Sequence, residues 1–258
     1  MFSKEEIQRI AMEQSARDLN CVPEDFLKSG PVLASGGLSP QAKRYYKEPL
    51  PINFVSYGSN VVASASTEYR DIAAEYIQKF QFYRCFETPA IHWLDERLAP
   101  MGQKVCFMAE YQLPDPDRVR PLPCSYAMQV LEQQDFSGLY LPEWSNALCE
   151  DRKQLDVLGV GAYDGDTLIG LAGCSADADM MWQIGVDVLP EYRRQGIAAA
   201  LTSRLALEIL KRDKVPFYCS AWSNLPSVRN ALRCGFSPAW VEMTVKPLNI
   251  VSEISDCS

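Results

Sequence analysis

The chain has 258 residues, of which 47% are hydrophobic, 10% aromatic and 22% charged, and this composition excludes a disordered, collagen-like or coiled-coil protein. Its 25 basic and 33 acidic side chains leave a net charge of −8, which disfavours nucleic acid as a partner. No apolar run reaches the roughly 18 residues of a membrane helix, and the charged first 20 residues do not resemble a signal peptide. We therefore expect a cytoplasmic protein with no membrane partner.

The first half of the chain predicts a small α/β domain. Ser3 and Glu6 have the spacing of a capping box, which starts a helix near the N-terminus. Residues 20–51 are rich in proline, glycine and serine and are predicted to be irregular. The other elements expected here are strands at 52–57 and 61–64 that form a hairpin, a helix from Thr67, a short helix near Pro89 and a strand at 104–111.

A proline-rich segment follows the first half. Four prolines fall between residues 114 and 123, where they disfavour both helix and sheet and favour an extended, stiff chain. Such segments are typical of domain boundaries. We therefore predict two domains, residues 1–121 and residues 122–258.

The second half shows clearer periodicity. The expected elements, in chain order, are a strand at 126–131, a helical region containing Phe136, Leu139, Trp144 and Leu148, strands at 157–163, 167–175 and 180–188, a helix at 196–212, a strand at 215–221, a short helix at 226–233 and a last strand at 239–245. This order describes an antiparallel meander that leads into a βαβ unit. The predicted fold class is therefore α+β (mixed α/β).

The cysteines and the one histidine do not predict a metal site. The nine cysteines are scattered along the chain with no C-x-x-C pair, and His92 is the only histidine. Most of the cysteines lie in apolar segments, which is typical of small buried side chains in a reducing compartment. We expect no metal cofactor.

Residues 186–198 carry the most informative pattern in the sequence. A strand ends at Val188, a polar loop follows, and a helix begins near Gly196. The unpaired N–H groups and the dipole at a helix N-terminus favour an anion such as a diphosphate, and glycine lets it approach the main chain. Arg193 and Arg194 could add charged hydrogen bonds. The segment has neither the glycines of a Rossmann fingerprint nor a Walker motif.

These residues resemble the GNAT superfamily of acetyl-CoA-dependent N-acetyltransferases. Arg193-Arg194-Gln195-Gly196-Ile197-Ala198 matches its Q/R-x-x-G-x-G/A motif, and Val188-Leu189-Pro190-Glu191-Tyr192 looks like the V-x-P-E-Y that commonly precedes it. Asn224-Leu225-Pro226-Ser227, with Gly235-Phe236 at the close, is similar to the second motif of the family. The resemblance covers roughly residues 122–246 and implies a central, mostly antiparallel, splayed sheet.

The resemblance also implies how the cofactor acetyl-CoA would bind. The main chain of Val186–Val188 would pair with the pantetheine arm, the amides of residues 193–199 would hold the pyrophosphate, and Asn224 would contact the arm. Two structural alternatives remain open, namely core packing for the two valines and a helix N-cap for Asn224. The residues so assigned are Val186, Asp187, Val188, Arg193, Arg194, Gln195, Gly196, Ile197, Ala198, Ala199 and Asn224.

The implied reaction is direct attack of a neutral primary amine, of a small molecule or a peptide, on the thioester, without a covalent enzyme intermediate. No catalytic residue is assigned. The usual proton-donating tyrosine falls at Ala231 and the usual base at Trp182, and Asp187 and Glu143 are weak substitutes for that base. The first domain or a second subunit of a homodimer would complete the acceptor pocket. Transfer of another acyl group, or a non-catalytic module that senses acyl-CoA, are the alternatives.

Overall fold

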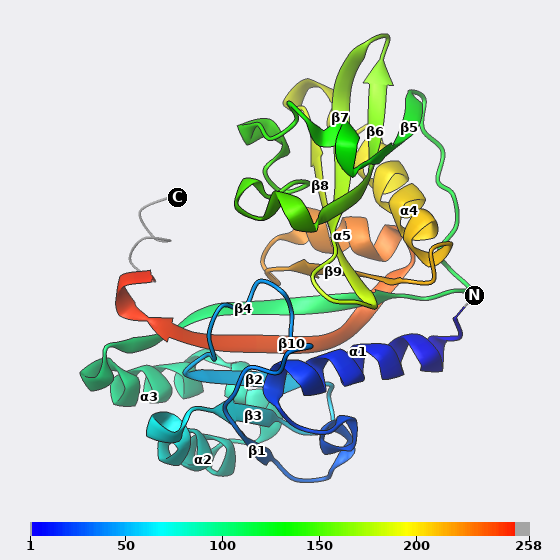
Figure 1. Ribbon diagram of the computed structural model, residues 1–258. Coiled ribbons are helices and arrows are strands. Elements are labelled where there is room, and N and C mark those ends of the chain that lie inside the picture. The colour runs from blue at the N-terminus through cyan, green and yellow to red at the C-terminus, as the bar shows by residue number, and fades with distance from the viewer. Residues whose placement is uncertain (1, 251–258) are drawn as a thin grey trace. The chain divides into compact units, whose positions relative to one another are not determined.

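A computed structural model describes residues 2–250 (Figure 1). The described residues divide into two compact units. The first, called the C-terminal unit, contains residues 2–10 and 111–238, and the second, called the N-terminal unit, contains residues 11–110 and 239–250. This division differs from the predicted boundary between residues 121 and 122.

Long elements that enter both units explain the difference. Strand β4 (Gln103–Pro114) and strand β10 (Phe236–Pro247) each begin in one unit and end in the other, as does helix α1 (Lys4–Leu19). The proline-rich segment is part of the C-terminal unit, because Val119 packs into its core and the amide of Asp115 donates to the carbonyl of Gly235 at 2.9 Å. The segment ends β4 at Pro114 and then turns at residues 115–119, so it is a packed connection and not a free linker.

The N-terminal unit combines a sheet with helices. Its strands follow the order β1-β3-β2-β10-β4, with β1 parallel to β3, and β3, β2 and β10 antiparallel in turn. The predicted capping box, hairpin and helices are present, whereas β1 lies in the stretch predicted to be irregular. The elements not yet given are η1 (Pro23–Leu27), β1 (Val32–Ser35), β2 (Ile52–Ser56), β3 (Val62–Ala65), η2 (Thr67–Tyr69), α2 (Arg70–Lys79), η3 (Phe82–Phe86), α3 (Thr88–Leu98) and η4 (Ala99–Met101).

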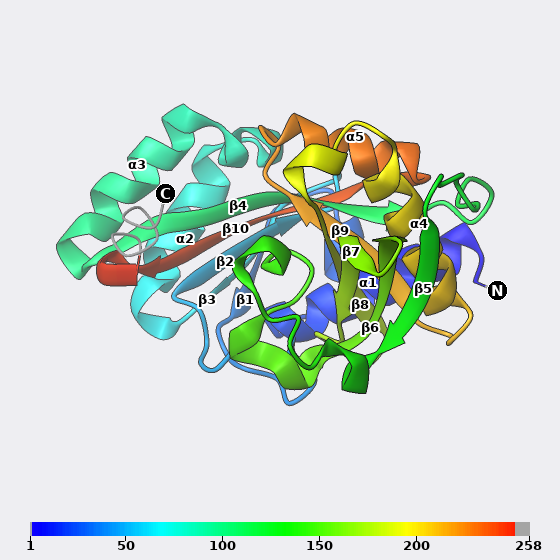
Figure 2. The same cartoon turned by 90° about the horizontal axis from the view of Figure 1, so that it is seen from above.

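The C-terminal unit contains the predicted meander and βαβ unit (Figures 1 and 2). Strands β5 to β8 pair antiparallel in chain order, and β9 pairs parallel with β8 after the crossover helix α4, which packs on β6, β7 and β8. The fold is thus mixed α/β with a mostly antiparallel sheet. Its elements are β5 (Ala127–Glu132), η5 (Gln133–Phe136), η6 (Pro142–Trp144), η7 (Glu150–Leu155), β6 (Asp156–Asp164), β7 (Thr167–Ser175), β8 (Met181–Val188), η8 (Pro190–Tyr192), α4 (Ile197–Leu210), β9 (Val215–Ser220) and α5 (Leu225–Arg233).

The segment between β5 and β6 differs from its prediction. It holds three short 3-10 turns, η5, η6 and η7, in place of the predicted helical region. Gly138 adopts a positive φ of 84° and Pro142 lacks an amide proton, and both features interrupt an α-helix. The apolar side chains that suggested a helix are buried all the same, because Phe136, Trp144 and Leu148 pack against the sheet residue Leu171.

No helix within residues 2–250 is long and apolar enough to cross a bilayer.

Candidate functional site

Strands β8 and β9 stop pairing before β8 ends. Their parallel register runs from Met181 opposite Val215 to Ile184 opposite Tyr218. On its other side, β8 stays paired with β7 as far as Val188. The edge of residues 185–188 that faces away from β7 therefore has no strand partner among the described residues. An extended ligand could add to the sheet along this open stretch.

The loop after β8 leads into α4 through two residues with positive φ, Arg194 at 65° and Gly196 at 84°. The first helical hydrogen bond runs from the amide of Ala200 to the carbonyl of Gly196. Within the described residues, the amides of residues 194–199 have no hydrogen-bond partner. They form the helix N-terminus with unpaired amides that the sequence predicts, and such a terminus favours an anion.

Two tyrosines hold this loop. Tyr192 donates its hydroxyl to a carboxylate oxygen of Asp164 at 3.0 Å, and Tyr126 donates to the side-chain oxygen of Gln195 at the same distance. The two rings meet edge to face with centroids 5.8 Å apart. The side chain of Gln195 is therefore engaged with Tyr126, and an anion would meet the main chain of this residue.

A pocket of about 270 Å³ opens at the start of α4. Four of its lining residues are arginines, although the chain as a whole carries a net charge of −8. The arginines come from two elements, the loop before α4 and helix α5, so the charge is concentrated at the unpartnered amides. The lining residues are Val188, Tyr192, Arg193, Arg194, Gly196, Ile197, Ala198, Ala199, Pro226, Arg229, Asn230 and Arg233.

Sequence reasoning missed the contribution of α5. Arg229 and Arg233 are four residues apart and therefore lie on one face of this helix, with Asn230 beside them. The i, i+4 pair of arginines was visible in the sequence, but nothing local indicates that this face meets the loop before α4.

The remaining predicted cofactor residues have mixed placements. Val186 and Val188 pack against the core under α4, so their side chains are structural, and the carbonyl of Val188 accepts from Nε of Arg193 at 3.0 Å. Ile197 and Ala199 are buried in the first turn of α4, where their amides remain unpartnered. Asn224 caps α5, accepting from the amide of Ser227 at 3.3 Å, and is outside the arginine pocket.

Asp187 binds a loop of the same unit. Its carboxylate accepts from the amide of Asn146 at 2.8 Å, the amide of Ala147 at 2.9 Å and the side-chain nitrogen of Asn146 at 2.7 Å. Gly173 and Gly185 allow this approach, since a Cβ at these positions would lie 2.2 Å from the Ala147 oxygen and 1.8 Å from the Asn146 oxygen. Asp187 thus fixes the loop onto the exposed end of β8.

Asp187→Asn should loosen this loop. The single oxygen of an amide can accept only some of the hydrogen bonds that the carboxylate accepts. The amide nitrogen is itself a donor and would face the N–H groups of the loop. We expect the free energy of unfolding to fall by about 1–3 kcal/mol in urea titration, and hydrogen exchange at the amides of residues 146 and 147 to accelerate. Glu143→Gln, a matched change at an exposed side chain of η6, should leave both unchanged. Equal effects in the two variants would contradict the anchoring role of Asp187.

Comparison with known proteins agrees with the geometry. Residues 125–236 match the sequence model of the Acetyltransferase (GNAT) family. This segment is a GNAT domain. A search of curated proteins gave no significant match.

Several solved structures are similar to this chain at low sequence identity. A GNAT-family protein from Novosphingobium aromaticivorans is 21% identical with a TM-score of 0.43, covering 56% of this chain and 66% of its own. A GCN5-related N-acetyltransferase from Kribbella flavida is 16% identical with a TM-score of 0.47, covering 61% and 63%. A Salmonella typhimurium protein solved with its cofactor acetyl-CoA is 15% identical with a TM-score of 0.37, covering 48% and 95%. The chain thus spans slightly under two thirds of the length of the first two proteins.

The GNAT domain carries unusual residues at the expected proton-transfer positions. Ala231 is fully buried in the core of the unit, and Trp182 packs against the same core. The hydroxyl of Tyr218, the last residue of β9 that pairs with β8, lies 2.9 Å from the hydroxyl of Ser227 on α5. Burial raises the pKa of Tyr218, so its phenol stays protonated near neutral pH.

Proposed function

We propose that the GNAT domain binds acetyl-CoA and transfers its acetyl group to a primary amine of a small molecule or a peptide. The observation that carries the proposal is the convergence of four arginines on the unpartnered amides at the start of α4. Helix N-terminus and guanidinium groups together form a site for a diphosphate. The pocket also suits a bulky anion because the space around Gly196 is open, the nearest atom to a Cβ placed there being 3.9 Å away.

Different residues of this chain would bind different parts of the cofactor. The amides of residues 194–199 would donate to the diphosphate, and Arg229 and Arg233 would neutralise further phosphate charge. The open main chain of residues 185–188 would pair with the extended arm that joins the diphosphate to the thioester. This arrangement directs the reactive end of the cofactor to the place where β8 and β9 separate.

Acetyl-CoA, when bound, supplies an activated acyl group as a thioester. Transfer then needs a neutral amine in contact with the carbonyl carbon, and the open end of β8 holds both reactants close together. Main-chain N–H groups there can polarise the carbonyl oxygen. Because direct attack requires no enzyme nucleophile, none of the cysteines needs to be reactive.

The residues Ala231 and Trp182 favour a second candidate function, a non-catalytic module that binds acyl-CoA as a sensor. Neither side chain can transfer a proton to or from the reactants.

The two candidate functions differ in whether acetyl-CoA is turned over. Release of free thiol from acetyl-CoA should be measured in the presence of spermidine, an aminoglycoside and a peptide with a free N-terminus. Micromolar binding of acetyl-CoA by calorimetry with no thiol released for any amine would support the sensor, and a comparison of acyl-chain lengths would define the acyl group.

Replacing both Arg229 and Arg233 by glutamine should weaken acetyl-CoA binding by about 10- to 100-fold, since each guanidinium is expected to make a charged hydrogen bond to phosphate. The loss should be largest at low ionic strength, because salt screens the interaction of exposed charges. Calorimetry at two salt concentrations measures both effects. Arg204→Gln with Lys211→Gln, which changes the charge equally outside the pocket, is the control and should bind normally. Equal weakening in both double variants would show that only the net charge matters.

A further inference from the structure

One face of the sheet in the N-terminal unit is polar and buried. Ser64, Asn53 and Thr244 stand opposite one another on β3, β2 and β10, and Glu242 follows on the same face of β10. None of the four is more than 6% exposed. The other face is apolar, with Phe54 packed under α2 and α3. Polar groups that lose their contact with water need hydrogen-bond or ionic partners inside the protein.

Charged side chains cover this polar face without neutralising it. The ammonium nitrogen of Lys43 lies 3.3 Å from Oδ2 of Asp18 and 3.4 Å from Oε2 of Glu242. The other oxygen of Glu242 accepts from the hydroxyl of Tyr46 at 3.0 Å and from Nδ2 of Asn53 at 2.9 Å. One buried cation therefore faces two buried carboxylates, which leaves an excess of one negative charge. Burial of this uncompensated charge raises the pKa of Asp18, so the ionised carboxylate would be favoured by a further cation beside it.

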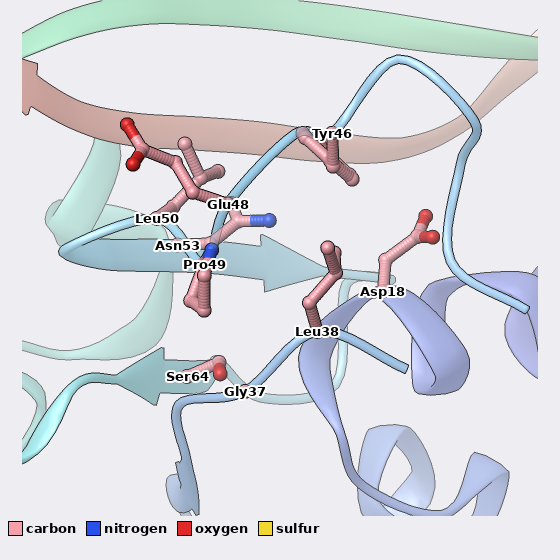
Figure 3. Close-up of a pocket in the computed structure, with 9 residues that line it drawn as sticks. All are labelled: Asp18, Gly37, Leu38, Tyr46, Glu48, Pro49, Leu50, Asn53 and Ser64. Carbon is pink, nitrogen blue, oxygen red and sulfur yellow. The ribbon is translucent and has the colours of Figure 1, made fainter. Parts of the chain in front are cut away.

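Asp18, Asn53 and Ser64 also line a cavity of about 10 Å³, enough for one group the size of a water molecule. Figure 3 shows the lining residues, which come from the end of α1, from β2 and β3 and from the loop 36–50. Oδ1 of Asn53 has no hydrogen-bond partner, and Oδ2 of Asp18 has only its ion pair with Lys43. The amide of Asn53 cannot be reversed, because its nitrogen donates to the carboxylate of Glu242. The lining of the cavity therefore includes two residues that each have an acceptor oxygen without a hydrogen bond.

We propose that this cavity is a binding site for a primary ammonium group, held by Asp18 and by Oδ1 of Asn53, with Ser64 at its wall. An –NH₃⁺ group has the size of a water molecule, donates three hydrogen bonds and supplies the missing positive charge. An anion would be repelled by Asp18 and by Glu48, which also lines the cavity. A quaternary ammonium has no N–H group and is too large. The site uses no residue of the arginine pocket, so it does not depend on the proposed acetyl transfer.

The probe for this site is methylammonium chloride, compared with tetramethylammonium chloride at the same ionic strength and measured with the full chain by calorimetry and thermal unfolding. We expect methylammonium alone to bind and to raise the unfolding midpoint. Asn53→Leu keeps the side-chain volume and removes the acceptor, so methylammonium should bind at least about tenfold more weakly. Thr244→Val is the matched control, because it removes a buried hydroxyl of the same face that does not line the cavity, and it should bind as the wild type does.

Equal responses to the two salts, or none to either, would overturn the proposal and indicate that the cavity holds water only. Undiminished binding by the Asn53→Leu variant would overturn it as well. If that variant does not fold, Ser64→Ala gives the same test, because it removes an acceptor from the cavity wall and should weaken methylammonium binding several-fold. Wild-type affinity in the folded Ser64→Ala variant would then count against the site.

Discussion

Gly196→Glu should abolish binding of acetyl-CoA, with a loss of affinity of roughly 100-fold or more. The substitution places a carboxylate at the start of α4, where the unpartnered amides and four arginines favour an anion, so it would compete with the diphosphate for the same donors. It also places a side chain at a φ of 84°, which only glycine adopts without strain. Calorimetric titration with acetyl-CoA measures the loss.

Two variants separate charge from strain and from general effects on folding. Gly196→Ala keeps the strain without adding charge, and because the nearest atom is 3.9 Å from the new Cβ, we expect binding within about tenfold of the wild type. Gly165→Glu makes the same chemical change at another glycine with positive φ, in the open turn between β6 and β7, and should bind normally. Wild-type affinity in the Gly196→Glu variant would refute the assignment of this turn as the diphosphate site.

Local signals in the sequence predicted the secondary structure around this turn correctly. The strand ending at Val188, the polar loop and the helix from Ile197 all lie where periodicity and the glycine indicated, because these features depend on neighbouring residues. The contribution of Arg229 and Arg233 depends on how α5 packs beside α4, which is a contact between distant segments. Asn224 was expected from its local sequence as a possible helix cap, and its side chain accepts the capping hydrogen bond from the amide of Ser227.

Predictions that needed long-range information were less successful. Strand β1 pairs with β3 across an irregular segment, and β10 leaves the C-terminal unit to join β2, so neither β1 nor the domain boundary has a local signature. The predicted helical region between β5 and β6 was wrong for a related reason. The spacing of its apolar residues reflects packing against the sheet. The main chain of the loop packs directly on the sheet because two strand glycines leave space for it.

Gly185→Ala should therefore strongly destabilise the C-terminal unit. Its new Cβ would lie 1.8 Å from the carbonyl oxygen of Asn146, a main-chain atom that Asp187 holds in place. The loop must move or the strand must bend, and we expect the free energy of unfolding to fall by about 3 kcal/mol or more in urea titration. Gly170→Ala on the neighbouring strand is the control. A Cβ there meets only side-chain carbons at 3.0–3.3 Å, and we expect a cost of about 1 kcal/mol or less.

The mechanism of this destabilisation can be tested by combining Gly185→Ala with Asp187→Asn. If the loop is the obstacle, the two substitutions act on one structural feature, because the second releases the main chain against which the first collides. Their combined cost should then be smaller than the sum of the single costs by about 1 kcal/mol or more. Strict additivity would show that Gly185→Ala acts through the strand itself. In that case the close packing of residues 146 and 147 would not be the reason that this position of β8 requires glycine.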